Sequence, residues 1–158
     1  MKPKKLPTMK DTEIDELLED QILCRIAFGG KDAPHIAPFQ YALVDGQPYF
    51  HFTKYGRKMA LLEKNSSSCV EIEKYNQDLS EYKFVVLTGK LRVVTDPEER
   101  SRAIQKMVDA AKMKRLSENF LMAHGFQKED GWAILTPDKP LIIVKLEDVT
   151  ERIGLKSP

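Results

Sequence analysis

The sequence predicts a small closed antiparallel β-barrel, mainly β with α, with six or seven strands in a Greek-key-like order and with N-terminal, middle and late helices. Three observations predict it. Consecutive strand-like segments are joined by short turn signals, one long β-branched run is interrupted by Gly89, and the helical segments are few and come mostly late. Consecutive strands joined by short turns pair antiparallel, whereas a doubly wound parallel sheet needs a helix after each strand. A glycine inside a strand indicates a bulge, which lets a sheet curl into a barrel.

Length, charge and the lengths of the apolar runs limit the kinds of function that this protein can have. The 158 residues fit one domain over 1–158, with residues 1–10 expected to be flexible. Twenty-five basic and twenty-four acidic residues leave a net charge of +1, so no global field draws the protein to nucleic acid or to anionic lipid. The apolar runs are too short to span a bilayer, and no apolar segment follows the lysine-rich start. We therefore expect a cytoplasmic protein that binds neither nucleic acid nor membrane.

The first half predicts a helix and a three-stranded meander. Apolar residues at helical spacing predict a helix over 8–21, with Thr8 or Asp11 as its cap. Strands are expected over 22–28, 35–44 and 48–53. The residues Gly29-Gly30-Lys31-Asp32 and the pair Asp45-Gly46 supply the two hairpin turns.

The second half adds strands and the later helices. A short helix is expected around Met59, and strands over 68–74 and 83–95. Asp96-Pro97-Glu98-Glu99 predicts a helix start, with the cap at Asp96 and proline at the first helical position. Its buried stripe would be Ile104, Met107, Val108 and Ala111. A helical piece over 116–124 ends at Gly125, and the last strands are expected over 132–135 and 141–146. Ile142, Val144 and Leu146 alternate along the last of these, either as core or as interface.

Two cations open the short helix around Met59. Arg57 and Lys58 follow Gly56, where the unpaired N–H groups and the helix dipole are already positive, and Lys54 is close by. A bound phosphate would reverse this unfavourable arrangement, because it accepts hydrogen bonds from the N–H groups and from both side chains. The alternative interpretation is a solvated basic turn.

Metal and disulfide chemistry are not indicated. Cys24 and Cys69 are isolated on predicted strands, without a CxxC motif or a His/Cys cluster, so we expect buried free thiols and no metal site.

The order of several motifs resembles a known family. These are Pro38-Phe39-Gln40-Tyr41 at a strand, the Asp45-Gly46 turn, Tyr49-Phe50-His51-Phe52-Thr53, Gly56-Arg57-Lys58, and the run Val85 to Lys90. Their succession resembles the FMN-binding split-barrel family, which includes pyridoxamine 5'-phosphate oxidases. The YFH and GRK segments are most similar to the nitroimidazole-resistance flavoproteins in it. The resemblance covers about residues 12 to 100 well and the C-terminal third loosely.

The resemblance implies a homodimer with FMN at the subunit interface. The phosphate would be held by Arg57 and Lys58, with Thr53 and Lys54 as further contacts. The flavin ring would lie along the backbone of the third strand and be bordered by the preceding one. The implied cofactor residues are Pro38, Phe39, Gln40, Tyr41, Tyr49, Phe50, His51, Phe52, Thr53, Lys54, Arg57 and Lys58.

Alternation along the third strand separates its side chains. If Phe50 and Phe52 point into the barrel, then Tyr49, His51 and Thr53 face the other way, toward cofactor or partner subunit. His51 matches the histidine of the YFH motif and is the candidate catalytic residue, since a histidine can relay a proton in flavin chemistry; the alternative is a structural interface histidine.

The remaining histidines and the tryptophan are expected to be structural. His35 and His124 look like surface or capping residues. Trp132 is expected to pack in the core or an interface, with stacking near a flavin as the alternative.

Three functions remain open at this level. The first is a flavin-dependent oxidoreductase acting on a small molecule, with nitro compounds as one candidate class. The second is a carrier that binds flavin, haem or deazaflavin without turnover. The third is an oligonucleotide-binding small barrel, against which the near-neutral charge weighs. The C-terminus Glu151 to Pro158 lacks the arginine segment of true pyridoxamine 5'-phosphate oxidases, which argues against oxidation of vitamin B6.

Overall fold

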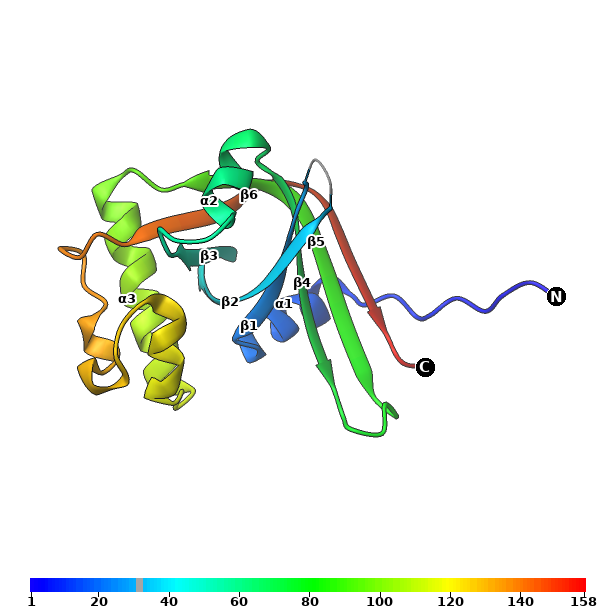
Figure 1. Cartoon of the computed structure of the whole chain (residues 1–158). Helices are drawn as coiled ribbons and strands as arrows, with labels where there is room; N and C mark the ends of the chain where they lie inside the picture. Colours follow the sequence, from blue (N-terminus) through cyan, green and yellow to red (C-terminus); the bar gives the residue numbers. More distant parts are fainter. Residues whose placement is uncertain (31–32) are drawn as a thin grey trace.

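Six antiparallel strands form a closed barrel in the order β1-β2-β3-β6-β5-β4 (Figure 1). This computed structural model describes residues 1–30 and 33–158. Lys31 and Asp32, which belong to the expected first hairpin turn, lie outside the described residues. The strands are β1 Leu23–Phe28, β2 His35–Val44, β3 Gln47–Phe52, β4 Ser67–Tyr75, β5 Tyr82–Val93 and β6 Ile142–Lys156. The predicted antiparallel barrel is confirmed.

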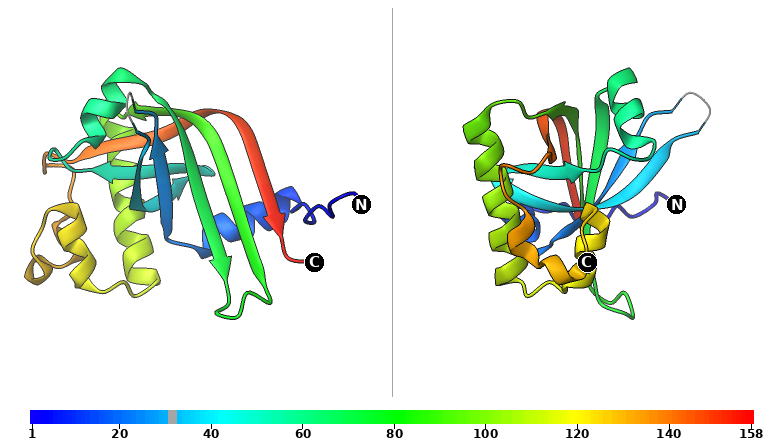
Figure 2. Two further views of the ribbon diagram at one scale, coloured as in Figure 1. Left: turned by 45° about the vertical axis from the view of Figure 1, so that its right-hand side comes forward. Right: turned by 60° about the vertical axis from the view of Figure 1, so that its left-hand side comes forward.

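Turn and bulge residues shape the barrel as the sequence predicts. Asp45 and Gly46 have φ values of 51° and 77°, as a two-residue turn between β2 and β3 requires. The pairing of β5 with β6 shifts register between Thr88 and Lys90, so Gly89 lies at a bulge. A Cβ at Gly89 would lie 2.7 Å from the Glu147 carbonyl oxygen, so only glycine allows this approach. Figure 2 shows β4, β5 and β6 running side by side as a long ribbon.

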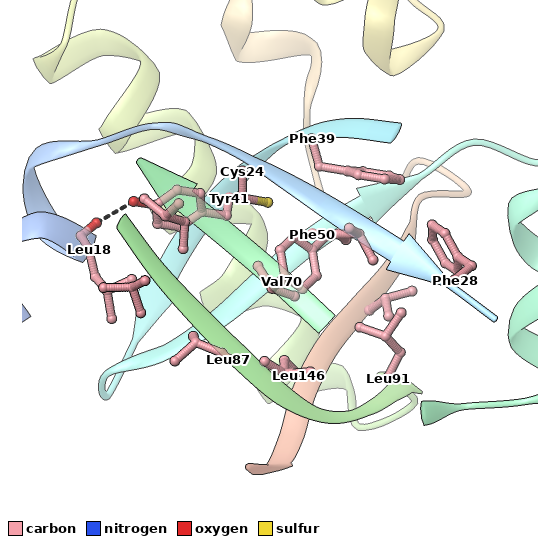
Figure 3. Packing of buried hydrophobic residues seen from close by; sticks show 14 of the residues in the cluster. Leu18, Cys24, Phe28, Phe39, Tyr41, Phe50, Val70, Leu87, Leu91 and Leu146 are labelled. Atoms are coloured by element: carbon pink, nitrogen blue, oxygen red, sulfur yellow. Dashed lines mark hydrogen bonds between the residues drawn. The ribbon is translucent and has the colours of Figure 1, made fainter. Parts of the chain in front are cut away.

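Side chains that alternate along the strands fill the barrel. Phe28, Phe50 and Phe52 are at most 2% exposed, and the Phe39 ring stacks on Phe52 with centroids 4.8 Å apart. Figure 3 shows Phe28, Phe39 and Phe50 pointing into one interior, together with Val70, Leu87 and Leu146. The end of the cluster is closed by α1 (Asp11–Asp20), where Tyr41 donates a hydrogen bond to the Leu18 carbonyl oxygen. The alternating apolar side chains of β6 are therefore core rather than interface: Val144 and Leu146 are buried, and Ile142 packs against them.

A second apolar cluster lies outside the barrel. The helix α3 (Pro97–Met113) packs on β2, and its buried stripe contains the four residues predicted. Asp96 caps this helix by accepting a hydrogen bond from the Glu99 N–H at 2.8 Å. The segment that follows forms three 3₁₀ turns, Glu118–His124, Lys128–Asp130 and Trp132–Ile134. Figure 1 shows α3 and this segment, coloured yellow to orange, on the same side of the barrel.

Three expectations about the secondary structure were wrong. Residues 132–135 form a 3₁₀ turn rather than a strand, because Gly131 at φ 70° and the packing of Trp132 under α3 fold the chain back. The last strand continues past Leu146 to Lys156. The cap of α1 is Lys10, not Thr8 or Asp11. Thr8 instead bridges to Leu155, and Met9 is buried, so the start is held against β6 before residue 10.

Within the described residues, no helix is long and apolar enough to cross a membrane.

Candidate functional site

The two faces of β3 have different surroundings. Phe50 and Phe52 point into the barrel, as expected, and Tyr49, His51 and Thr53 lie on the opposite face. That face is covered by the chain itself over part of its length. Tyr49 is buried beside α3 and donates a hydrogen bond to Glu99 Oε1 at 2.7 Å, so the expectation that its side chain opens toward a cofactor or partner is wrong. The burial raises the pKa of Tyr49 to about 12.

His51 and His124 form a hydrogen-bonded pair whose rings meet edge to edge and lie nearly in one plane. Their ring centroids are 5.2 Å apart with 13° between the planes, and the two Nδ1 atoms lie 3.0 Å apart. His124 Nε2 lies 2.7 Å from Gln40 Oε1. The expectation that His124 is a surface or capping residue was therefore wrong. Gly125, at φ 83°, ends the 3₁₀ turn as predicted, but the turn is oriented so that the His124 ring points inward against β3.

Burial keeps both imidazoles neutral. Desolvation lowers the pKa of His51 to about 3, with the neighbouring His124, Lys58 and Arg100 adding to the effect, and desolvation lowers the pKa of His124 to about 4. A neutral imidazole has one N–H donor and one acceptor nitrogen, so the pair can share a hydrogen bond that two cations could not. At neutral pH the pair is an uncharged polar group on the outer face of β3.

A groove of about 280 Å³ lies next to this pair. Its walls come from the end of β3 and the residues after it, from the end of the first 3₁₀ turn, and from the segment before β6. The side chains that matter here are His51, Thr53, Tyr55, His124, Phe126 and Leu141. The groove combines an apolar floor with two imidazoles, a hydroxyl and the nearby cation Lys54.

A basic corner adjoins the same end of β3. Arg57 is the N-cap of the seven-residue helix α2 (Lys58–Lys64), and it and Lys54 are exposed. Lys58 Nζ lies 5.0 Å from the centroid of the Phe39 ring, and burial lowers the pKa of Lys58. Among residues 1–30 and 33–158, no carboxylate forms an ion pair with Lys54, Arg57 or Lys58. The corner is thus a local positive site that an anion can neutralise.

The side chains of four expected cofactor residues are not accessible to a ligand. Phe39, Tyr41, Phe50 and Phe52 are buried in the barrel core, because they occupy its inward-facing positions. Only their backbone is open to a ligand role. Pro38 lies exposed on the outward face of β2, and Gln40 is buried on that face beneath α3. The structure therefore brings Gln40, His51 and Thr53 together around His124, and places Arg57 and Lys58 at the adjacent corner.

His124 was missed as a site residue. Its position before Gly125 indicates a helix end, and nothing in the local sequence shows that the ring reaches β3. The expectation for Trp132 is confirmed as packing: its Nε1 donates to the Leu116 carbonyl oxygen at 3.0 Å, and the ring lies edge-on to His124. Cys24 and Cys69 are free thiols, one buried and one half-buried. In the described part of the chain, no group of His, Cys, Asp and Glu residues could hold a metal ion.

Comparison with known proteins gives one family and many structures of the same fold. The sequence profile of the pyridoxamine 5'-phosphate oxidase family matches residues 10–131. No curated protein sequence matches the chain. An FAD-binding protein from Mesorhizobium loti superposes with a TM-score of 0.70 at 17% identity, over 97% of this chain and 99% of that one.

Two further structures are similar over almost the whole chain. A proposed 5-nitroimidazole antibiotic resistance protein from Bacteroides thetaiotaomicron has a TM-score of 0.66 at 15% identity, over 97% of this chain and 89% of that one. An FAD and haem binding protein from Mycobacterium smegmatis has a TM-score of 0.67 at 13% identity, over 98% of this chain and 74% of that one. At these identities the similarity shows a shared fold.

Proposed function

Because the chain belongs to the pyridoxamine 5'-phosphate oxidase family, we propose that it is an FMN-binding flavoprotein and a flavin-dependent oxidoreductase of a small molecule. The single observation that supports this most is the basic corner at the end of β3. Lys54, Arg57 and Lys58 gather there without a carboxylate partner among the described residues. Structures of the same fold include proteins named as FAD-binding.

The phosphate group of FMN fits the corner chemically. The first N–H groups of α2 have no partner within the helix, whose first internal bond runs from the Leu61 N–H to the Arg57 carbonyl oxygen. A dianionic phosphate would accept hydrogen bonds from these groups and from Arg57 and Lys58. Charge-assisted bonds of this kind contribute about 1.5 to 3 kcal/mol each. Lys58 lies over the Phe39 ring in this structure and would turn toward the phosphate by a change of rotamer.

The flavin ring would lie along the outer face of β2 and β3 next to Pro38 and the β3 backbone. FMN itself would supply the redox chemistry, and the protein would supply the position of the ring and access to it. At about 280 Å³, the groove beside His51 is too small to hold both the flavin ring and a substrate. We therefore propose that a second copy of the chain completes the pocket in a homodimer. Sedimentation of the purified protein tests this directly: a monomer that binds FMN tightly would contradict it.

His51 is proposed to contact the substrate. It lies at the groove, and its pKa of about 3 makes it a hydrogen-bond partner rather than a proton donor at neutral pH. This is a narrower role than the proton relay considered from the sequence. Nitro compounds remain one candidate substrate class.

A second candidate is a carrier that binds flavin or haem without turnover. A similar structure is named as binding both FAD and haem, which favours this alternative. In that case the same groove and corner would hold the cofactor, and no electron donor would be consumed.

Two measurements test these functions. The visible spectrum of the purified protein, with identification of the small molecule released on denaturation, tests for FMN. A protein that neither contains nor binds flavin would contradict the proposal. Anaerobic reduction with NADH or NADPH, followed by reoxidation with oxygen, a quinone or a nitro compound, then separates enzyme from carrier. Turnover with a donor and an acceptor supports the oxidoreductase, and reduction by neither donor supports the carrier.

A further inference from the structure

Two buried hydrogen bonds connect His51 to His124 and His124 to Gln40. The orientation of the Gln40 amide determines which atom is the donor in each of them. The amide group of Gln40 donates through Nε2 to the Met107 carbonyl oxygen of α3 at 3.3 Å. The opposite amide orientation would place two acceptor oxygens against each other, so Gln40 Oε1 is the atom that faces His124. An amide oxygen only accepts hydrogen bonds. His124 Nε2 therefore carries the proton and donates to Gln40 Oε1 at 2.7 Å.

The protonation of His51 follows in one step. A neutral imidazole carries one proton, so His124 Nδ1 is a lone-pair acceptor. His51 Nδ1, 3.0 Å away, must then be the donor. His51 Nε2 is consequently unprotonated and is a hydrogen-bond acceptor.

This acceptor nitrogen is accessible from the groove. His51 Nε2 forms no hydrogen bond with the described residues. If it were also shielded from solvent, it would be a buried polar atom without a partner, and in the described part of the chain the only such side-chain atom is Ser68 Oγ. His51 Nε2 is thus reached by solvent, and His51 lines the groove of about 280 Å³. The apolar side chains of Phe126 and Leu141 line the same groove.

The charges around the groove disfavour a cationic ligand. Lys54 lies on its wall, and Lys58 and Arg100 act on His51 with the same sign. The apolar walls disfavour a strongly hydrated anion. The groove therefore has space for a flat apolar ligand, and His51 Nε2 can accept one hydrogen bond from it.

We infer that this groove binds a neutral aromatic or heteroaromatic compound that donates an N–H or O–H hydrogen bond to His51 Nε2. His124 and Gln40 are positioning residues, which fix the His51 tautomer from behind without touching the ligand. The assignment of this compound as the substrate rests on the proposed flavin chemistry, whereas the binding itself does not.

Indole and 1-methylindole form a matched pair of probes. They have nearly the same shape, but only indole has the N–H donor. One hydrogen bond contributes about 1 kcal/mol, so indole is expected to bind about fivefold more tightly. The binding is followed in the full chain by NMR of ¹⁵N-labelled histidine, with and without saturating FMN. The same spectra show which ring nitrogen of His51 carries the proton, and we expect Nδ1.

Variants distinguish the hydrogen bond that fixes the His51 tautomer from the apolar fit of the probes in the groove. In His124→Phe the ring remains but the acceptor for His51 Nδ1–H is lost, and the preference for indole should fall to about unity. Gln40→Met removes the group that fixes the His124 tautomer, and serves if His124→Phe does not fold. It should lower the preference in the same way and shift the His51 tautomer toward Nε2–H. Phe126→Leu is the control, since it should weaken both probes equally and leave their ratio unchanged.

Several results would overturn the inference. These are equal binding of the two probes, binding of neither, a proton on His51 Nε2 in the unaltered protein, or an unchanged preference in both variants. Displacement of indole by FMN would assign the groove to the cofactor and so overturn its assignment to a substrate. Failure of FMN to bind, with the indole preference intact, would instead contradict the proposed function alone.

Discussion

The His51 and His124 rings meet edge to edge through their Nδ1 atoms, 3.0 Å apart, and join β3 to a 3₁₀ turn that lies 73 residues later in the sequence. The contact links the barrel to the layer formed by α3 and the following turns. Trp132 and Phe120 meet the His124 ring edge-on and enclose it further. Because the pair is enclosed, any change in its charge affects the stability of the fold as well as the groove.

Stability should fall on mild acidification. The unfolded chain has histidine pKa values near 6.5, whereas in the folded chain burial lowers them to about 3 for His51 and about 4 for His124. Below pH 6.5 the unfolded state takes up protons that the folded state does not, so each histidine lowers the free energy of unfolding by about 1.4 kcal/mol per pH unit. The free energy of unfolding continues to fall until the pH approaches the pKa values of the two histidines in the folded chain. Urea unfolding at pH 7.0, 6.0 and 5.0 measures it.

The interval from pH 6.5 to 5 lies above the range in which most carboxylates titrate, so the histidines dominate it. In His124→Gln the slope of stability against pH should fall by about half. A free energy of unfolding that is constant over this interval would show that the pair is not buried and neutral.

Gly89→Ala should destabilise the barrel by about 1 to 3 kcal/mol, the usual cost of forcing an added group into a packed site. A Cβ there would lie 2.7 Å from the Glu147 carbonyl oxygen, and the backbone of β6 cannot move away without disturbing its pairing. Gly29→Ala is the matched control, since its added Cβ meets only the Asn65 side chain at 3.2 Å. Chemical denaturation of the two variants compares them, and equal stability would argue against the bulge.

Asp96→Ala should destabilise by about 1 kcal/mol, because the first turn of α3 loses the acceptor for the Glu99 N–H. Asp96→Asn keeps an oxygen at this position and should be close to the unaltered protein. Thermal unfolding followed by circular dichroism distinguishes them. A loss in Asp96→Asn as large as that in Asp96→Ala would mean that capping is not the role of this side chain.

The barrel could be predicted because its signals are local. The bounds of β2 match the expectation over 35–44, since hairpin chemistry at Asp45-Gly46 fixes where that strand ends. The cap at Asp96 and the bulge at Gly89 were likewise found from neighbouring residues alone.

The errors come from contacts that are distant in sequence. Residues 132–135 have the apolar composition of a strand, but Trp132 is held by the Leu116 carbonyl oxygen and packs under α3. The second half of β6 was missed because it is rich in charged and exposed residues, and β5 supplies its hydrogen bonds. His124 was placed at the surface for the same reason, since the strand it contacts is not its neighbour in sequence.

The central claim is that the basic corner binds the phosphate of FMN, and the affinities for FMN and riboflavin test it most directly. Riboflavin has the same ring but no phosphate. The unaltered protein should bind FMN far more tightly than riboflavin, by about 100-fold if two charge-assisted hydrogen bonds form. Arg57→Gln/Lys58→Gln should bring the two affinities close together, whereas the control Lys64→Gln, at the other end of α2, should leave them unchanged. Equal affinities for FMN and riboflavin in the unaltered protein, or full FMN affinity in the double variant, would contradict the account.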